Sequence, residues 1–278
     1  AELTGVYGTN TTFPLNQNMV VSGTLTVTGQ ATLTIQGGLE IPEGTTVYIE
    51  EGSSIIVNSG TANVIIAGNL NVYETGAFTV TLSKEVNISG TILSEEDARL
   101  AFNAPTKLTG SASVTSMGTF EANNGLEIGS EATLSLQGAV STDGIKNSGT
   151  ITMDGASIAG TATINMAASG AVVNIYSVSF GSTNASLEIT DAGLTVGQTV
   201  AVNDNSVIIS LNNSSYANSA IEGLVFTESV TAKTQGSVTD YVNTLQMSGN
   251  ASVNVNSNVQ IDENVDIIKI AISSTAQA

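Results

Sequence analysis

Short runs in which hydrophobic and polar residues alternate recur along the first 180 residues of the chain. They include TLTV (24–27), TLTI (32–35), LEI (39–41), TVYI (46–49), SIIV (54–57), NVII (63–66), NLNV (69–72) and FTVTL (78–82). A period of two puts pairs such as Leu25 and Val27 on one face of a strand and leaves Thr, Asn and Glu on the other. The pattern therefore predicts many short, half-buried strands.

Glycines punctuate these strands at a fixed interval. Gly44, Gly52, Gly60, Gly68 and Gly76 are each eight residues apart, and each interval holds one β-type run. One supersecondary unit repeated in this way is typical of a solenoid, in which each unit buries its apolar face against its neighbours. We expect these glycines at the corners of the coil, where the backbone needs a positive φ or a close approach. Three units would make a three-sided turn of about 24 residues and two would make a flattened turn, and the spacing does not choose between them.

Two segments depart from this rhythm near the start and middle of the chain. Residues 1–18 lack the repeat and contain Pro14, so we expect either a cap over the first turn or an arm that packs on a neighbouring subunit. Residues 84–109 break the spacing, and SEEDARLAF (94–102) reads as a short helix, because Ser94 can cap it and Asp97 stands at its third position. We expect this helix to be a lateral insertion or a cap between sections of the solenoid.

The composition changes again towards the C-terminus. Strands and glycines alternate with less regular spacing up to about residue 181, and beyond residue 200 glycine becomes sparse. The run ENVDIIKIAISS is the most continuously apolar β-type stretch of the chain and includes a hydrophobic strand predicted at 264–273. Such a strand must be paired within the chain or with another subunit, because an exposed edge of this kind aggregates. We therefore divide the chain into an N-terminal arm or cap (1–18), a β-solenoid (19–200) and a C-terminal β section with a terminal strand (201–278).

The predicted fold class is all-β, a parallel β-helix or β-solenoid with a short helical insertion near 94–102. A β-sandwich or jelly roll is the alternative, because strands every 8–12 residues also suit those folds.

Charge and composition exclude several classes of function. The 278 residues carry a formal net charge of −18, and the six basic residues are scattered as Lys84, Arg99, Lys107, Lys146, Lys233 and Lys269. Nucleic-acid binding needs clustered cations, so we expect no nucleic-acid partner. No apolar run reaches the roughly 18 residues of a membrane-spanning helix. Hydrophobic residues make up 41% of the chain, which suffices for an extensive core.

Candidates for catalysis and metal binding are weak. The chain has no His, no Cys and no Trp, and a single Arg, so the usual acid–base residue, thiolate chemistry and the usual zinc ligands are missing. The carboxylate runs Glu50/Glu51 and Glu95/Glu96/Asp97 have simpler explanations, since adjacent residues on a strand point to opposite faces and acids favour a helix start. We predict no catalytic, cofactor-binding or metal site and no enzyme activity.

Calcium is the one cofactor that the composition leaves open. Hard cations take carboxylate oxygens, and several aspartates stand in or near predicted turns, namely Asp143, Asp154, Asp191, Asp204 and Asp262. No calcium-binding motif supports them, and solvated carboxylates are the better reading.

Several features favour a location outside the cell or at its surface. The sequence starts at Ala1 rather than at Met, as a mature product does after removal of a signal peptide. Six N-x-[ST] sequons are candidate glycosylation sites, at Asn10, Asn87, Asn184, Asn212, Asn213 and Asn250. We therefore expect an extracellular or cell-surface protein that can carry glycans.

Over about residues 19–181 the chain resembles extracellular β-solenoid surface proteins in its repeat, its acidity and its richness in Thr, Ser, Asn and Gly. These proteins include surface-layer subunits, adhesins and filament subunits. The resemblance is architectural and implies a structural subunit of an extracellular filament, sheath or surface layer, a homopolymer that assembles through its ends. An adhesin or carbohydrate-binding β-solenoid module is the alternative, and a polysaccharide-degrading enzyme is a third, disfavoured reading.

Overall fold

The protein is an all-β parallel β-solenoid in both units into which the chain divides, Ala1–Thr142 and Asp143–Ala278. The computed structural model describes residues 1–168 and 170–173 with their side chains, and beyond residue 173 it describes the backbone of the strands alone. The strands of successive turns pair in parallel, whereas a sandwich or jelly roll is built from antiparallel strands. The alternative fold is therefore excluded.

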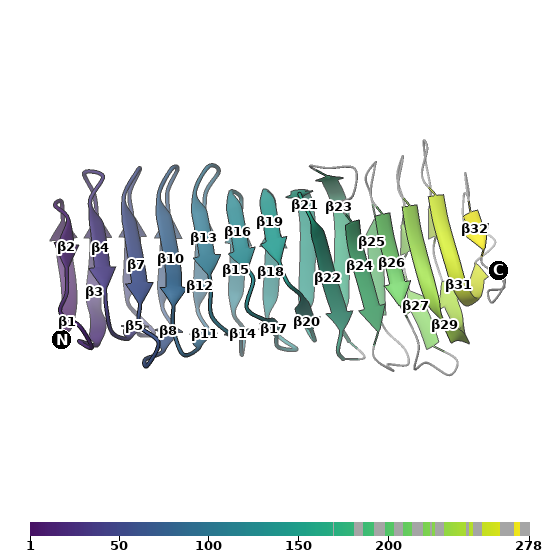
Figure 1. Ribbon diagram of the computed structural model, residues 1–278, viewed down its shortest axis with the longest axis horizontal. Coiled ribbons are helices and arrows are strands. Elements are labelled where there is room, and N and C mark those ends of the chain that lie inside the picture. Colours follow the sequence, from purple (N-terminus) through teal and green to yellow (C-terminus); the bar gives the residue numbers. More distant parts are fainter. Residues whose placement is uncertain are drawn as a thin grey trace. The chain divides into compact units, whose positions relative to one another are not determined.

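The first unit winds through seven three-sided turns, and its strands lie side by side from turn to turn, coloured purple to teal in Figure 1. Side one contains the first parts of β1 (Glu2–Tyr7) and β3 (Met19–Val27), then β5 (Leu39–Ile41), β8 (Val64–Ile66), β11 (Val86–Ile88), β14 (Thr106–Leu108) and β17 (Leu126–Ile128). Side two contains the second parts of β1 and β3, then β6 (Thr46–Ile49), β9 (Asn69–Val72), β12 (Thr91–Ser94), β15 (Ser113–Ser116) and β18 (Thr133–Leu136). Side three contains β2 (Thr11–Thr12), β4 (Thr32–Ile35), β7 (Ser54–Asn58), β10 (Ala77–Leu82), β13 (Arg99–Phe102), β16 (Thr119–Ala122) and β19 (Ala139–Thr142).

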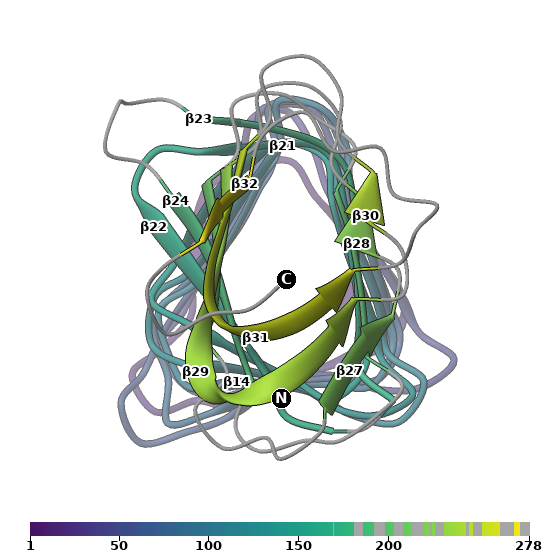
Figure 2. The same ribbon diagram turned by 90° about the vertical axis from the view of Figure 1, so that its right-hand side faces the viewer.

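The second unit is also wound in parallel, and Figure 2 shows β22 beside β24 and β21 beside β23. Its strands pair as β20–β22–β24–β26–β29, β21–β23–β25–β27–β29, β29–β31–β32 and β28–β30. They are β20 (Ile145–Asn147), β21 (Thr150–Ile158), β22 (Thr161–Met166), β23 (Val172–Phe180), β24 (Ser186–Asp191), β25 (Gln198–Val202), β26 (Ile208–Asn212), β27 (Ser219–Glu222), β28 (Leu224–Val225), β29 (Thr231–Val242), β30 (Leu245–Gln246), β31 (Ser252–Ile261) and β32 (Ile270–Ile272).

The core of the first unit consists of columns of inward-facing side chains, one residue from each turn. On side three, Leu33, Ile55, Phe78, Leu100, Phe120 and Val140 follow one another in register and are all buried. The rings of Phe78 and Phe120 each lie 6.2 Å, centroid to centroid, from the ring of Phe102 in the neighbouring column. The hydrophobic positions of the alternating runs thus face this core, and the polar positions face outward.

All five glycines of the eight-residue repeat stand in corners between strands, as expected, and three repeats make one turn. Their physical roles differ. Gly52 has a φ of +68° in a tight turn, whereas a Cβ on Gly68 would overlap the backbone carbonyl oxygens of Pro42 and Thr45. Gly60 needs neither property, because a Cβ there would meet only the side chain of Leu82, at 3.3 Å. The expectation of backbone constraint is therefore wrong at Gly60.

The predicted helix at 94–102 does not form. Ser94 ends β12, Glu95–Ala98 make a β-turn closed by a hydrogen bond from Ala98 N to Glu95 O (3.1 Å), and Arg99 begins β13. Asp97 has a φ of 59°, which a right-handed helix cannot contain. The stacking of Leu100 on Phe78 and Phe120 determines this segment, and it overrides the local capping signals.

Candidate functional surfaces

Among the residues that the structure describes, the strands of the first turn are paired along one edge only. Residues 1–18, predicted as an arm or a cap, form β1 and β2, and within the part of the chain that the structure describes β1 pairs with β3 alone and β2 with β4 alone. Thr28 N donates to Tyr7 O (2.9 Å) and Phe13 N donates to Thr34 O (2.9 Å). Because alternate residues of a parallel strand direct their N–H and C=O groups to opposite sides, those of Val6 and Thr12 point away from the second turn.

Side chains at this end of the unit are apolar but poorly covered. Val6 and Leu15 have the largest exposed fractions among the described large hydrophobic residues, 72% and 74%. Tyr7 and Phe13, half-buried, close the end of the core with an edge-to-face contact at 6.1 Å between ring centroids. The surface formed by β1, β2 and these four side chains is called the end surface below.

The end surface also lies in a part of the chain with very little charge. Residues 1–38, which form the first two turns, contain one charged side chain, that of Glu2, although the whole chain has a net charge of −18. This end therefore contributes little electrostatic repulsion against another copy.

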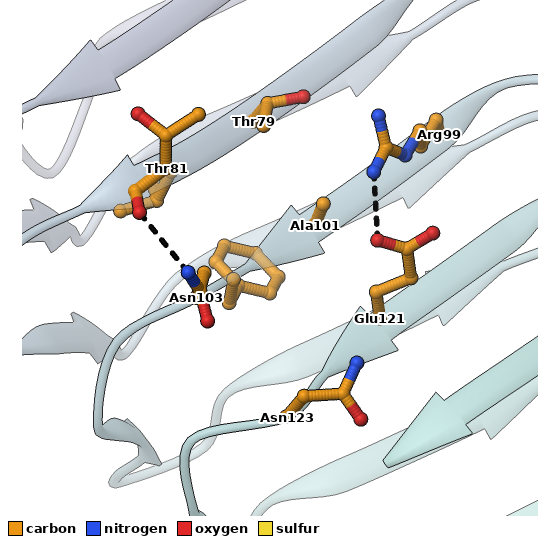
Figure 3. A pocket seen from close by; sticks show the side chains of 9 residues that line it. Thr79, Thr81, Arg99, Ala101, Asn103, Glu121 and Asn123 are labelled. Carbon is orange, nitrogen blue, oxygen red and sulfur yellow. Dashed lines mark hydrogen bonds and ion pairs between the residues drawn. The ribbon is translucent and has the colours of Figure 1, made fainter.

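A second surface is a shallow groove on the outer face of side three, across β10, β13 and β16 (Figure 3). Its volume is about 220 Å³, and it is lined by Thr79, Val80, Thr81, Arg99, Ala101, Phe102, Asn103, Glu121 and Asn123. Thr79, Ala101 and Glu121 stand in register on the three strands. The methyl group of Ala101 is the shortest of these outward side chains, which leaves the hollow between its neighbours.

We call this groove the side-three groove. Charged and amide groups surround it on the outer face. Arg99 Nη2 lies 2.7 Å from Glu121 Oε2, and the two side chains point towards each other in Figure 3. Asn103 Nδ2 donates to Thr81 O (3.2 Å), and the amide of Asn123 exchanges hydrogen bonds with Ser141 Oγ (3.1 and 3.2 Å). The groove is thus locally neutral, and its lining combines these polar groups with the apolar Val80, Ala101 and Phe102.

A groove of about 330 Å³ lies on the outer face of side one, over β3, β5 and β8. Val20, Glu40 and Ile65 face outward there in register. Asn18 Oδ1 accepts a hydrogen bond from Gly38 N (2.7 Å) at its margin, which ties the corner of one turn to the next.

The candidate carboxylates gather at the corners between sides two and three. Glu50 and Glu51 lie in a turn rather than on a strand, so the opposite-face argument does not apply to them, and Glu95, Glu96 and Asp97 lie in a β-turn rather than at a helix start. Tyr48 and Tyr73 stack beside them, with centroids 6.1 Å apart. Partial burial and the nearby Glu50, Tyr48 and Glu95 raise the pKa of the Tyr73 hydroxyl. Within the residues described with side chains, no group of three or more acids is arranged to hold a metal ion.

The remaining sequence candidates are dispersed. Asn10 is exposed in a loop, and its Oδ1 accepts from Thr32 N (2.9 Å), while the half-buried Asn87 lies in β11 and accepts from Thr109 Oγ1 (3.0 Å). Asp143 and Asp154 are exposed. Asn212 and Asp191 lie in β26 and β24, where only the backbone is described. The other sequons and aspartates, at Asn184, Asn213, Asn250, Asp204 and Asp262, lie outside the described residues, as does most of the terminal strand predicted at 264–273.

The side-three groove was not predicted from the sequence. The signal was present, because Thr79, Ala101 and Glu121 are 22 and 20 residues apart, which are lengths of one turn. No helix in the part of the chain that the structure describes is long and apolar enough to cross a membrane. Comparison of the chain with protein-family models, with curated proteins and with solved structures finds no match.

Proposed function

We propose that this protein is a structural subunit of an extracellular filament, sheath or surface layer, and that its copies join end to end through the end surface. The unpaired edge of β1 and β2 carries the proposal. An open strand edge is a template for another strand, and the main-chain hydrogen bonds of the added strand provide affinity.

Two further features support assembly at this place. Val6 and Leu15 are exposed next to the edge, so a docked strand would bury apolar surface as well as satisfy backbone groups. Because residues 1–38 carry almost no charge, two copies repel each other little at this end of the unit. The carboxylates at the corners repel other copies from the sides of the unit. A heterologous contact of this kind repeats without closing and generates a filament.

The stacked core suits a structural role. In the first unit, each turn is held to the next by a parallel ladder on each of three sides and by columns of apolar side chains. The extracellular setting of the proposal rests on the acidity of the chain, its lack of cysteine and its sequons.

Proline substitution at the two positions whose N–H groups point away from the second turn tests the proposal. We expect the wild-type chain to form end-to-end polymers, and the double variant Val6→Pro/Thr12→Pro to remain monomeric with an unchanged β-sheet circular dichroism spectrum. Proline removes the donor that a docked strand needs and is tolerated where the N–H faces solvent. Sedimentation velocity and electron microscopy over a range of concentrations are the measurements.

The matched control is Val6→Thr/Thr12→Ser, which keeps both N–H groups and should still assemble. If the proline pair perturbs the first turn, Val6→Lys/Thr12→Lys blocks the same edge with charge and should also stay monomeric. A wild-type chain that is monomeric at every concentration, or edge-blocked variants that polymerise normally, would contradict the proposal.

A further inference from the structure

The hollow of the side-three groove arises from the register of three successive turns. Ala101 occupies the outward position between Thr79 and Glu121, and it is only 4% exposed because the longer side chains around it rise on both sides. A volume of about 220 Å³ is below the roughly 300–1,000 Å³ of sites that hold drug-sized ligands. The groove therefore suits one small unit, or one unit of a longer chain that runs over the surface.

The lining chemistry selects the class of ligand. Thr79 offers a hydroxyl group, and Thr81, whose Oγ1 donates to Val57 O (3.1 Å), offers its hydroxyl oxygen as an acceptor. Asn103 and Asn123 offer amides with both donors and acceptors, and Arg99 and Glu121 offer planar groups of opposite charge. Because the only arginine of the chain is already compensated by Glu121 at 2.7 Å, the groove has no excess positive charge for a phosphate or a polyanion. An apolar ligand would leave the hydroxyl, amide and charged groups of the lining without hydrogen-bond partners.

A ligand that matches alternating donors and acceptors without net charge is a polyhydroxylated one. We propose that the side-three groove binds one sugar ring of a neutral glycan. This inference concerns the outer face and does not depend on assembly through the end surface.

The groups that would contact the sugar are held in place by one another. The Arg99–Glu121 pair and the hydrogen bonds of Asn103 to Thr81 O and of Asn123 to Ser141 Oγ fix their side chains across successive turns. Arg99 has five N–H donors and Glu121 has two carboxylate oxygens, so both keep hydrogen-bonding capacity for sugar hydroxyls. Less side-chain entropy is lost when such groups bind a ligand.

The test uses the full chain with four probes, the methyl glycosides of glucose, galactose, mannose and N-acetylglucosamine. In a titration followed by two-dimensional ¹H–¹⁵N NMR, at least one of them should cause saturable chemical-shift changes at amides of β10, β13 and β16. The expected Kd is about 1 mM, which corresponds to a binding free energy of about −4 kcal/mol. Ala101→Leu fills the hollow and should weaken binding at least tenfold. Ala139→Leu places the same side chain on an exposed alanine of β19 outside the groove and should bind as the wild type does.

A second variant keeps the test decisive if Ala101→Leu disturbs the sheet. Asn103 is exposed and its side chain donates a hydrogen bond to the backbone oxygen of Thr81, so Asn103→Ala should retain the fold and still lose affinity at least threefold. The proposal is overturned if no glycoside saturates, if both groove variants bind like the wild type, if the shifts map elsewhere, or if inorganic phosphate competes for the same residues.

Discussion

At the scale of single residues, the regularly spaced glycines mark the corners of the coil, but the physical requirement for glycine differs from one corner to the next. Gly68 is required because the carbonyl oxygens of Pro42 and Thr45 occupy the space of a side chain, and Gly52 because of its positive φ. Gly60 is bounded only by a flexible leucine. The spacing of glycines in the sequence indicates the period of the coil. Whether a glycine lies too close to other atoms for a side chain depends on the backbone of the neighbouring turn, and the spacing carries no information about that contact.

This difference gives a matched pair of substitutions. Gly68→Val should lower the free energy of unfolding by several kcal/mol, beyond the ~1–3 kcal/mol typical of overpacking, because backbone atoms cannot move aside as a side chain can. Gly60→Val should cost less than about 1 kcal/mol, since Leu82 can change rotamer. Urea unfolding midpoints of the two variants measure the difference, and equal losses would show that the backbone contact at Gly68 is unimportant.

At the scale of elements, most strands of the first unit could be predicted from alternation alone, and the segment 94–102 could not. Its Ser, Glu and Asp residues form a good local helix start, yet Leu100 stands 22 residues after Phe78, one turn further along the same column. Burial of a column residue against two neighbouring turns contributes more than a capping interaction. A search for apolar residues at intervals of 20–23 would have identified the strand. The outward residues Thr79, Ala101 and Glu121 each follow a residue of that apolar column by one position, so the same period also indicates the groove.

The aromatic contacts inside side three allow the contribution of this strand to be measured. Phe102→Ala should destabilise the protein by about 3–5 kcal/mol, because the buried ring packs between Phe78 and Phe120 and leaves a cavity. Phe13→Ala, in the half-buried contact with Tyr7 at the end surface, serves as the control and should cost much less. Urea midpoints again provide the comparison. If both variants lose the same stability, the core is not organised around the Phe102 column.

At the scale of the whole molecule, a stack of turns has a simple consequence. Each turn is stabilised only by its neighbours, so the two ends of a stack differ from its middle. The end surface combines an unpaired strand edge, exposed Val6 and Leu15, and two turns with a single charged side chain. The composition predicts that the chain is acidic, but it does not predict that acidic residues are nearly absent from the first two turns. That distribution can be assigned only when the strand register shows which residues form each turn.

Imaging of the assembled protein tests the central claim most directly. Cryo-electron microscopy of the purified chain, at a resolution that separates strands about 4.8 Å apart, should reveal polymers in which a strand from a second copy continues the ladder beyond β1 and β2. Particles that stay monomeric, or a polymer whose contacts lie on the sides of the solenoid with the β1 and β2 edge unpaired, would contradict it.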